Sequence, residues 1–160
     1  MKRFIAFYHR LLTWLMVGTV AVLIVPVTLQ IVSRYTALIP SWIWTEELSR
    51  FLFIWMVMLG AMIGVREGTH FEVDIWPDLG RKATALLRIL SNVLVLVFAL
   101  VFVWWGAEFV RFGWNQNSEL AELPMAFIFT AWPVAGATWV LFLGESLLGN
   151  IRILLAETGG

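Results

Sequence analysis

The chain has 160 residues, of which 61% are hydrophobic and 14% charged, and its formal net charge is zero. A soluble domain would carry about a quarter of charged residues, and a nucleic-acid-binding protein would need a basic face that a neutral chain does not supply. The absence of cysteine excludes disulfides, thiolate chemistry and cysteine-ligated metals.

Four stretches of the chain are apolar enough to cross a bilayer, which takes about 20 residues for a hydrocarbon core of about 30 Å. We predict an all-α membrane protein whose four transmembrane helices cover residues 11–33, 42–65, 86–107 and 123–146. Short connections take up the rest, so we expect one integral-membrane domain over residues 1–160.

The first span, residues 11–33, follows a basic N-terminus and resembles a signal peptide at first sight. Its apolar run is longer than a signal core of about 7–15 residues, and no small-x-small cleavage pattern closes it. Pro26 lies within this span and Pro133 within the fourth. Each proline removes a backbone donor, which predicts a kink in its helix.

The second span contains only 15 uncharged residues, 51–65, and these would reach about 22 Å as a helix. That length is too short for a bilayer. We therefore predict that the helix begins at residue 42. Its first part, residues 42–50, is then an amphipathic arm in the interface that leads into the membrane.

The predicted arm combines aromatic and charged side chains. Trp42 and Trp44 suit an interface, where an indole can be half apolar and half wet. Glu46 and Arg50 are four residues apart, and Glu47 and Arg50 three, so their charges can pair along one helix face. We predict that the arm contacts another membrane subunit, with these five residues as the interface.

The connection between the second and third spans is the most polar part of the chain. We predict that Arg66, His70 and Asp74 order it. His70 and the chain's other histidine, His9, both lie outside the spans. A haem held between membrane helices would need histidines within the spans, so we expect no haem and no other cofactor.

The middle of the spans offers little polar chemistry. Thr19, Thr130 and Thr138 are there, and such hydroxyls can bond to carbonyls of their own helix. No serine–histidine–acid cluster or intramembrane carboxylate pair is present, so we expect no enzyme. We also predict no substrate or metal site within this chain alone, since transporters place polar groups near the midplane for cargo and ions.

The distribution of lysine and arginine predicts the orientation. With the N-terminus inside, eight basic residues face the cytoplasm and three face outward. The eight are Lys2, Arg3, Arg10, Arg66, Arg81, Lys82, Arg88 and Arg152, and the three are Arg34, Arg50 and Arg111. We therefore predict that both termini are cytoplasmic.

The two charged clusters and the run into the fourth span resemble a known family, the small permease subunits of tripartite ATP-independent periplasmic (TRAP) transporters. The matching segments occur in the family's order and spacing. They are Trp44-Thr45-Glu46-Glu47-Leu48-Ser49-Arg50, Phe53-Ile54-Trp55, Gly60-Ala61, Arg66-Glu67-Gly68-Thr69-His70-Phe71 with Val73 and Asp74, Ser118-Glu119-Leu120, Leu123-Pro124 and Trp132-Pro133-Val134-Ala135-Gly136.

The resemblance implies an accessory subunit in the bacterial inner membrane. A periplasmic binding protein would deliver the solute, often an organic acid, to a large permease that couples uptake to sodium. This chain would pack against the large permease within the membrane lipids. Some small subunits are fused to the large one, and the end at Gly160 fits the separate form.

Two alternatives remain open from the sequence. One is the membrane anchor of a redox complex, which would hold haem or quinone. The other is a small transporter that works by itself as a homodimer.

Overall fold

The computed structural model describes residues 2–36, 40, 42–68, 81–119 and 121–158. Its helices are α1 (Lys2–Tyr35), α2 (Trp44–Glu67), α3 (Arg81–Gly113), the short α4 (Ala126–Phe129) and α5 (Ala131–Thr158). Within these ranges the only β feature is an isolated bridge between Asn117 and Pro124. The predicted all-α fold is therefore confirmed.

Four helical stretches of the described chain are long and apolar enough to cross a membrane, at residues 3–35, 44–67, 89–113 and 126–147. They follow the order of the four predicted spans. Helices α3 and α5 continue past residues 107 and 146, where the predicted third and fourth spans ended. Those predictions followed the uncharged runs, whereas a helix can extend into the interface, where its charged side chains are solvated.

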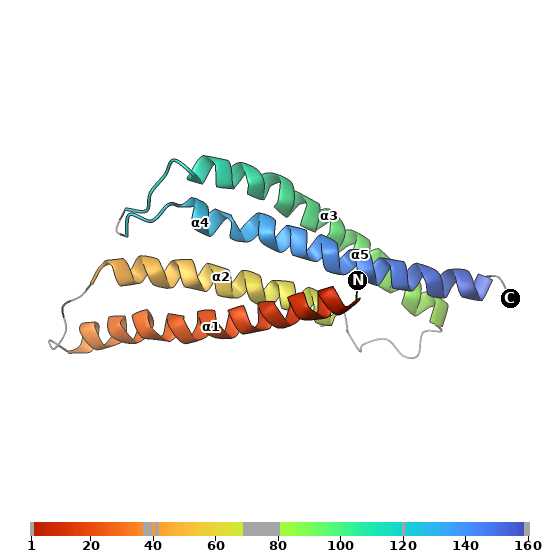
Figure 1. Cartoon of the computed structure of the whole chain (residues 1–160), viewed down its shortest axis with the longest axis horizontal. Coiled ribbons are helices and arrows are strands. Elements are labelled where there is room, and N and C mark those ends of the chain that lie inside the picture. The colour runs from red at the N-terminus through yellow and green to blue at the C-terminus, as the bar shows by residue number, and fades with distance from the viewer. Residues whose placement is uncertain (1, 37–39, 41, 69–80, 120, 159–160) are drawn as a thin grey trace.

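The helices form two hairpin-like pairs (Figure 1). Helix α1 packs on α2, and α3 packs on α5. Helix α2 also packs on α5 and so joins the pairs, while α4 lies at one end beside α3. Helices α2 and α5 are therefore central, and α1 and α3 flank them.

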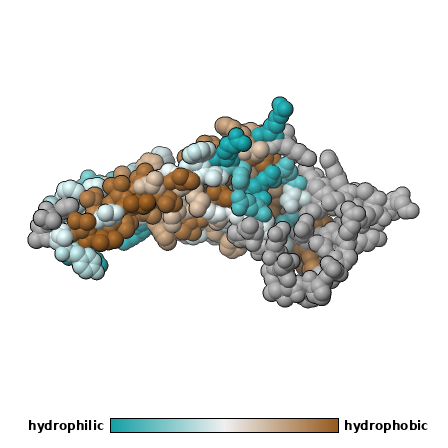
Figure 2. Space-filling view, turned by 90° about the horizontal axis from the view of Figure 1, so that it is seen from below, coloured by the Kyte–Doolittle hydropathy of each residue, from teal (hydrophilic) through white to brown (hydrophobic). Residues whose placement is uncertain are grey.

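The core lies where α1, α2 and α5 meet. Its most buried large side chains are Phe142, Ile5 and Met62, and Trp139 packs among them. Half of the apolar window of the fourth span is buried inside the bundle, against 6% for the first. Most of α1 consequently presents apolar side chains outward, as the brown surface in Figure 2 shows.

Helices α3 and α5 approach each other through small residues. A Cβ atom at Gly136 would lie 2.6 Å from the backbone oxygen of Ala99, and one at Gly106 would lie 2.7 Å from the Pro133 ring. Both distances are shorter than van der Waals contact. Glycine at these points lets the two backbones touch, as small residues commonly do between membrane helices.

The two prolines lie in different backbone settings. Helix α1 runs through the buried Pro26 without a break in its assignment. In the last span, the helix is interrupted at Thr130, between α4 and α5. Pro133 has no N–H to donate to the carbonyl of Phe129, the residue just before this interruption. The kinks at Pro26 and Pro133 stay predictions, because these backbone assignments do not measure a change in helix direction.

The close approach of α3 and α5 predicts the effect of adding one methyl group. Gly136→Ala should destabilise the bundle by roughly 1–3 kcal/mol, because the new Cβ overlaps the α3 backbone. Gly144→Ala, on the same helix but with nothing within 4 Å of its Cβ position, is the matched control. Thermal unfolding in detergent measures both, and equal melting temperatures would contradict the packing argument.

Candidate functional site

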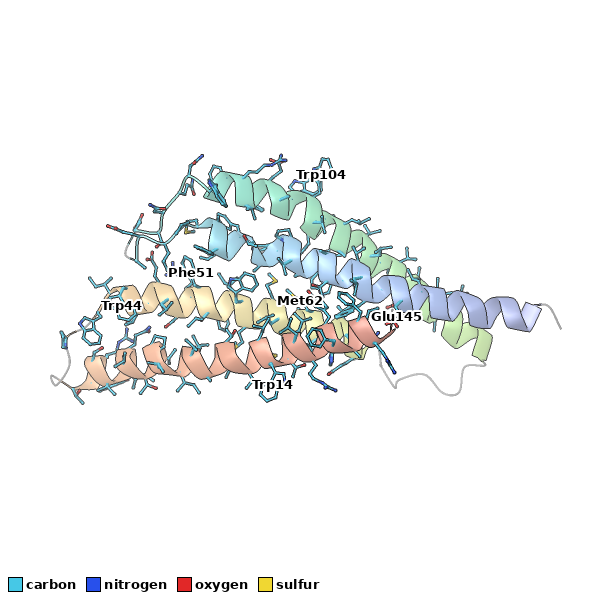
Figure 3. The ribbon with its side chains drawn as sticks, viewed as in Figure 1. Trp14, Trp44, Phe51, Met62, Trp104 and Glu145 are labelled. Atoms are coloured by element: carbon cyan, nitrogen blue, oxygen red, sulfur yellow. The ribbon has the colours of Figure 1, made fainter. Side chains whose placement is uncertain are left out.

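Many polar contacts of the described residues lie at the two ends of the bundle. We call one the loop end, where α1 ends, α2 begins and the connection between α3 and α4 lies. We call the other the N-terminal end, where α1 begins, α2 ends and both meet the middle of α5. Figure 3 shows Trp44 at the loop end and Glu145 at the N-terminal end.

At the loop end, Glu47 ties α2 to the connection between α3 and α4. Its carboxylate accepts a hydrogen bond of 2.5 Å from the backbone N–H of Ala121. Only 7% of the Glu47 surface is exposed. The next residue, Glu122, has a φ of 53°, in the left-handed region that non-glycine residues rarely occupy. The buried carboxylate thus helps to hold a tight turn.

Hydrogen bonds within the same connection stabilise its shape. Ser118 donates its N–H to the carbonyl of Leu123 at 2.8 Å, and its hydroxyl accepts from the N–H of Leu123 at 3.2 Å. Met125 donates to the carbonyl of Gln116 at 2.8 Å. The connection is therefore an ordered hairpin-like segment that Glu47 fixes to α2.

A second contact at the loop end joins α1 to α2. The amide of Gln30 donates to the carbonyl of Thr45 at 2.8 Å and to the hydroxyl of Ser49 at 2.7 Å. Thr45 itself is 2% exposed. One glutamine in an apolar helix thereby fixes the first turns of α2 against α1.

The five residues of the predicted arm divide between two faces of α2. Glu47 points into the bundle, whereas Trp42, Trp44, Glu46 and Arg50 are exposed. The two indoles stack with their ring centroids 6.2 Å apart. In the structure these residues belong to the start of α2 and the residues just before it. These four side chains therefore form an outward-facing surface. The pairing of Arg50 with Glu46 and Glu47 stays a prediction.

At the N-terminal end, an ion pair connects α2 to α5. Nη1 of Arg66 lies 2.6 Å from Oε2 of Glu145, and the two side chains are 32% and 18% exposed. The Arg66 guanidinium also lies 5.7 Å from the ring centroid of Phe142, within cation–π range. Of the three residues predicted to order the loop, Arg66 is thus held by its contacts with α5. His70 and Asp74 lie outside the described residues.

Hydroxyls and indoles in the middle of the bundle are used within the chain. Thr19, Thr130 and Thr138 each donate to a carbonyl four residues earlier, as predicted. The hydroxyls of Thr138 and Tyr8 share a hydrogen bond of 2.7 Å that joins α5 to α1. Trp139 donates to the carbonyl of Ala61 at 3.3 Å. These groups stabilise helix packing.

Sequence reasoning missed the partners that link distant segments. Glu145 comes directly after the apolar run of the fourth span, and Arg66 directly after that of the second. Both therefore lie at the same edge of the membrane, which is a sequence signal that could have paired them. Asn92 donates to Ser146 at 3.0 Å and similarly joins α3 to α5. The contacts of Gln30 and Glu47 had no sequence signal, because they depend on how the two helix pairs meet.

The described part of the chain contains no group of three or more histidine or acidic side chains that could hold a metal ion. Its geometry fits a helical bundle whose polar groups hold it together and whose flanking helices face outward.

Comparison with known protein families gives a match that covers most of the chain. Residues 23–153 match the model of the family described as tripartite ATP-independent periplasmic transporters, DctQ component. The chain belongs to this family. The resemblance inferred from the charged clusters is confirmed, and the protein is a small permease of the TRAP type and a multi-pass bacterial membrane protein.

Individual relatives agree with the family match. The small permease is 28% identical over 157 residues to a TRAP transporter small permease protein of Haemophilus influenzae, covering 94% of both chains. It is 28% identical over 145 residues to the sialic acid TRAP transporter small permease protein SiaQ of Vibrio cholerae, covering 87% of this chain and 80% of that one.

A third relative is longer. The isethionate TRAP transporter permease protein DctMQ of Oleidesulfovibrio alaskensis is 26% identical over 148 residues, covering 88% of this chain. The small permease spans only 23% of the length of that relative.

Removal of either member of the Arg66–Glu145 pair should destabilise the bundle. Arg66→Gln leaves a half-buried carboxylate without its cation, and we expect a loss of about 1–3 kcal/mol. Arg111→Gln is the control, since Arg111 and its partner Glu108 are 77% and 59% exposed and such pairs contribute little. A double-mutant cycle with Glu145→Gln, followed by thermal unfolding, measures the coupling; additive losses would contradict it.

The hydrogen bond from Ala121 to Glu47 predicts local protection from exchange. In Glu47→Ala, the Ala121 amide should exchange with solvent about tenfold faster or more, because it loses a charged acceptor. Glu47→Gln, which keeps an acceptor oxygen, should retain part of the protection. The matched control is Glu46→Ala, whose side chain is exposed. Hydrogen exchange read by mass spectrometry would refute the role if the Glu46 and Glu47 variants behaved alike.

Proposed function

We propose that this small permease is a scaffold that packs against a large permease and has no solute site of its own. The supporting observation is that the polar groups of its spans are engaged in contacts between or within its own helices. An alternating-access transporter would need such groups to face a cavity near the midplane. A rigid bundle instead offers a fixed surface against which a partner can move.

We propose the arm as the principal contact with the large permease. Gln30 and Glu47 fix the inner face of this segment to the rest of the bundle, so its outer face is held in one orientation. Trp42, Trp44, Glu46 and Arg50 then present stacked indoles and both charges to a neighbour. Aromatic and arginine side chains are typical anchors of subunit interfaces.

The transported solute is proposed to be an organic acid. Relatives are named for isethionate and sialic acid, an organic sulfonate and a carboxylate. On this proposal a periplasmic binding protein delivers the solute, and the large permease couples its uptake to sodium. The match to one part of the longer DctMQ fits a small subunit joined there to a large one. This chain would then be no enzyme.

We further propose that the protein lies in the inner membrane with both termini in the cytoplasm. The support is the excess of lysine and arginine at the N-terminal end and in the connection to α3. His70 and Asp74 are proposed to order that connection. Family membership does not favour a redox anchor or a self-sufficient transporter.

The arm proposal predicts a loss of complex with an intact fold. Glu46→Ala combined with Arg50→Ala and Trp44→Ala should lower co-purification of the large permease and reduce solute uptake about tenfold, since these side chains face away from the core. Melting temperature of the isolated small permease should stay unchanged. The control is Glu108→Ala with Arg111→Ala, an exposed pair on α3. Unchanged complex yield in the arm variant would reject this interface.

The absence of a solute site is tested with the partner present and absent. Liposomes that contain only the small permease should not accumulate solute. In the full complex, Thr130→Val with Thr138→Val should leave the sodium dependence of uptake unchanged, because both hydroxyls bond to helix carbonyls. Uptake by the small permease alone, or altered sodium coupling in the variant, would overturn the scaffold proposal.

A further inference from the structure

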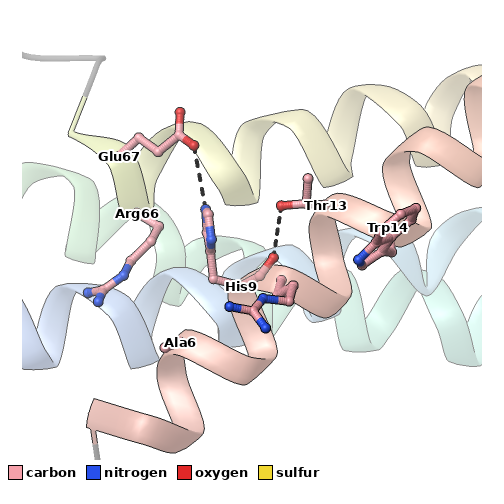
Figure 4. Close-up of a pocket in the computed structure, with 7 residues that line it drawn as sticks. Ala6, His9, Thr13, Trp14, Arg66 and Glu67 are labelled. Atoms are coloured by element: carbon pink, nitrogen blue, oxygen red, sulfur yellow. Dashed lines mark hydrogen bonds and ion pairs between the residues drawn. The ribbon is translucent and has the colours of Figure 1, made fainter.

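A hollow opens at the N-terminal end between α1 and α2 (Figure 4). Its volume is about 710 Å³, and its lining includes His9, Arg10, Thr13 and Trp14 of α1 with Arg66 and Glu67 of α2. Figure 2 shows hydrophilic (teal) surface beside apolar (brown) surface on this side of the molecule. None of the contacts proposed for transport uses it.

The charge of the hollow favours an anion. Two guanidinium groups line it, against one carboxylate. Arg66 makes its ion pair with Glu145 through Nη1, and a guanidinium has five N–H donors in all. Arg10 is exposed. Planar guanidinium groups are well suited to phosphate oxygens, which they can bind through two parallel hydrogen bonds.

His9 marks a polar deficit in the wall of the hollow. Its Nε2 is shielded from solvent and has no hydrogen-bond partner among the described residues. The nearest carboxylate oxygen, Oε1 of Glu67, lies 3.6 Å away, which is beyond hydrogen-bond range (Figure 4). A buried polar atom without a partner is unfavourable. Among the described residues, the polar wall of the hollow is therefore not fully hydrogen-bonded.

The surroundings of the hollow match a lipid at the membrane surface. Trp14 is 69% exposed and points away from the bundle (Figure 3). Toward the middle of the membrane, Leu15 and Val22 of α1 are also exposed. An acyl chain could lie along these side chains while its headgroup remained at the level of Trp14, where indoles sit in membranes.

From this arrangement we propose that the hollow binds the phosphate group of a phospholipid, with Arg10 as its main ligand and Arg66 as a second donor. Glu67 opposes the phosphate charge and lowers the affinity. The lipid would be wedged between α1 and α2 at their shared end. This site is independent of the transport role and of the arm.

The test uses the full-length protein, purified in detergent and stripped of lipid, with phosphatidylglycerol added and binding read by native mass spectrometry. Arg10→Gln should bind the lipid about tenfold more weakly, as expected for loss of a charge-assisted hydrogen bond. Arg34→Gln is the matched control, since Arg34 is an exposed arginine at the other end of α1. Its affinity should equal that of the unmodified protein.

Three further measurements make the result specific. Diacylglycerol with the same acyl chains, which lacks phosphate, should bind as weakly as phosphatidylglycerol does to Arg10→Gln. Glu67→Gln should strengthen phosphatidylglycerol binding roughly fivefold, because it removes a like charge. If millimolar inorganic phosphate displaces phosphatidylglycerol, the phosphate site also accepts a soluble ligand. If it does not, the site binds phosphate only as part of a lipid. Equal affinities for the Arg10 and Arg34 variants, or for diacylglycerol and phosphatidylglycerol, would overturn the proposal.

Discussion

The structure depends on one constraint: a polar group within the bilayer needs a partner inside the protein, since lipid offers none. In this chain several such groups find that partner on a different helix. Gln30 bonds the start of α2, Tyr8 bonds Thr138 of α5, and Trp139 bonds a carbonyl of α2. Each of these bonds satisfies a donor and also fixes two helices together, so the bundle has few polar groups left for a solute.

Packing supplies the second part of the stability. Lipid is as apolar as leucine, so membrane helices associate through close contact and hydrogen bonds. Gly106 and Gly136 allow the backbones of α3 and α5 to touch, and the core around Met62 and Phe142 joins the other pair to α5. Helix α5 is consequently the most enclosed of the spanning helices, while α1 and α3 turn much of their surface outward.

The sequence was sufficient for the number of spans, their order and the family, because apolar length is a local property and the charged clusters are contiguous. It also placed the aromatic and charged residues of the arm at the start of the second helix. It did not find the partners of Glu47 and Arg66. Those depend on the contact between α2 and α5 and on a connection 74 residues from Glu47 along the chain. The helices extend beyond the predicted spans, since charge marks the edge of the bilayer and not the end of a helix.

The carboxylate of Glu47 has a mechanical consequence. It belongs to the first turn of α2, whose outer face is open to a neighbour, and it grips the backbone at Ala121, next to a turn in a strained conformation. A force on that outer face would reach the hairpin-like segment through this short bond. The two helix pairs are therefore mechanically coupled at the loop end, through a contact that involves no residue of the apolar core.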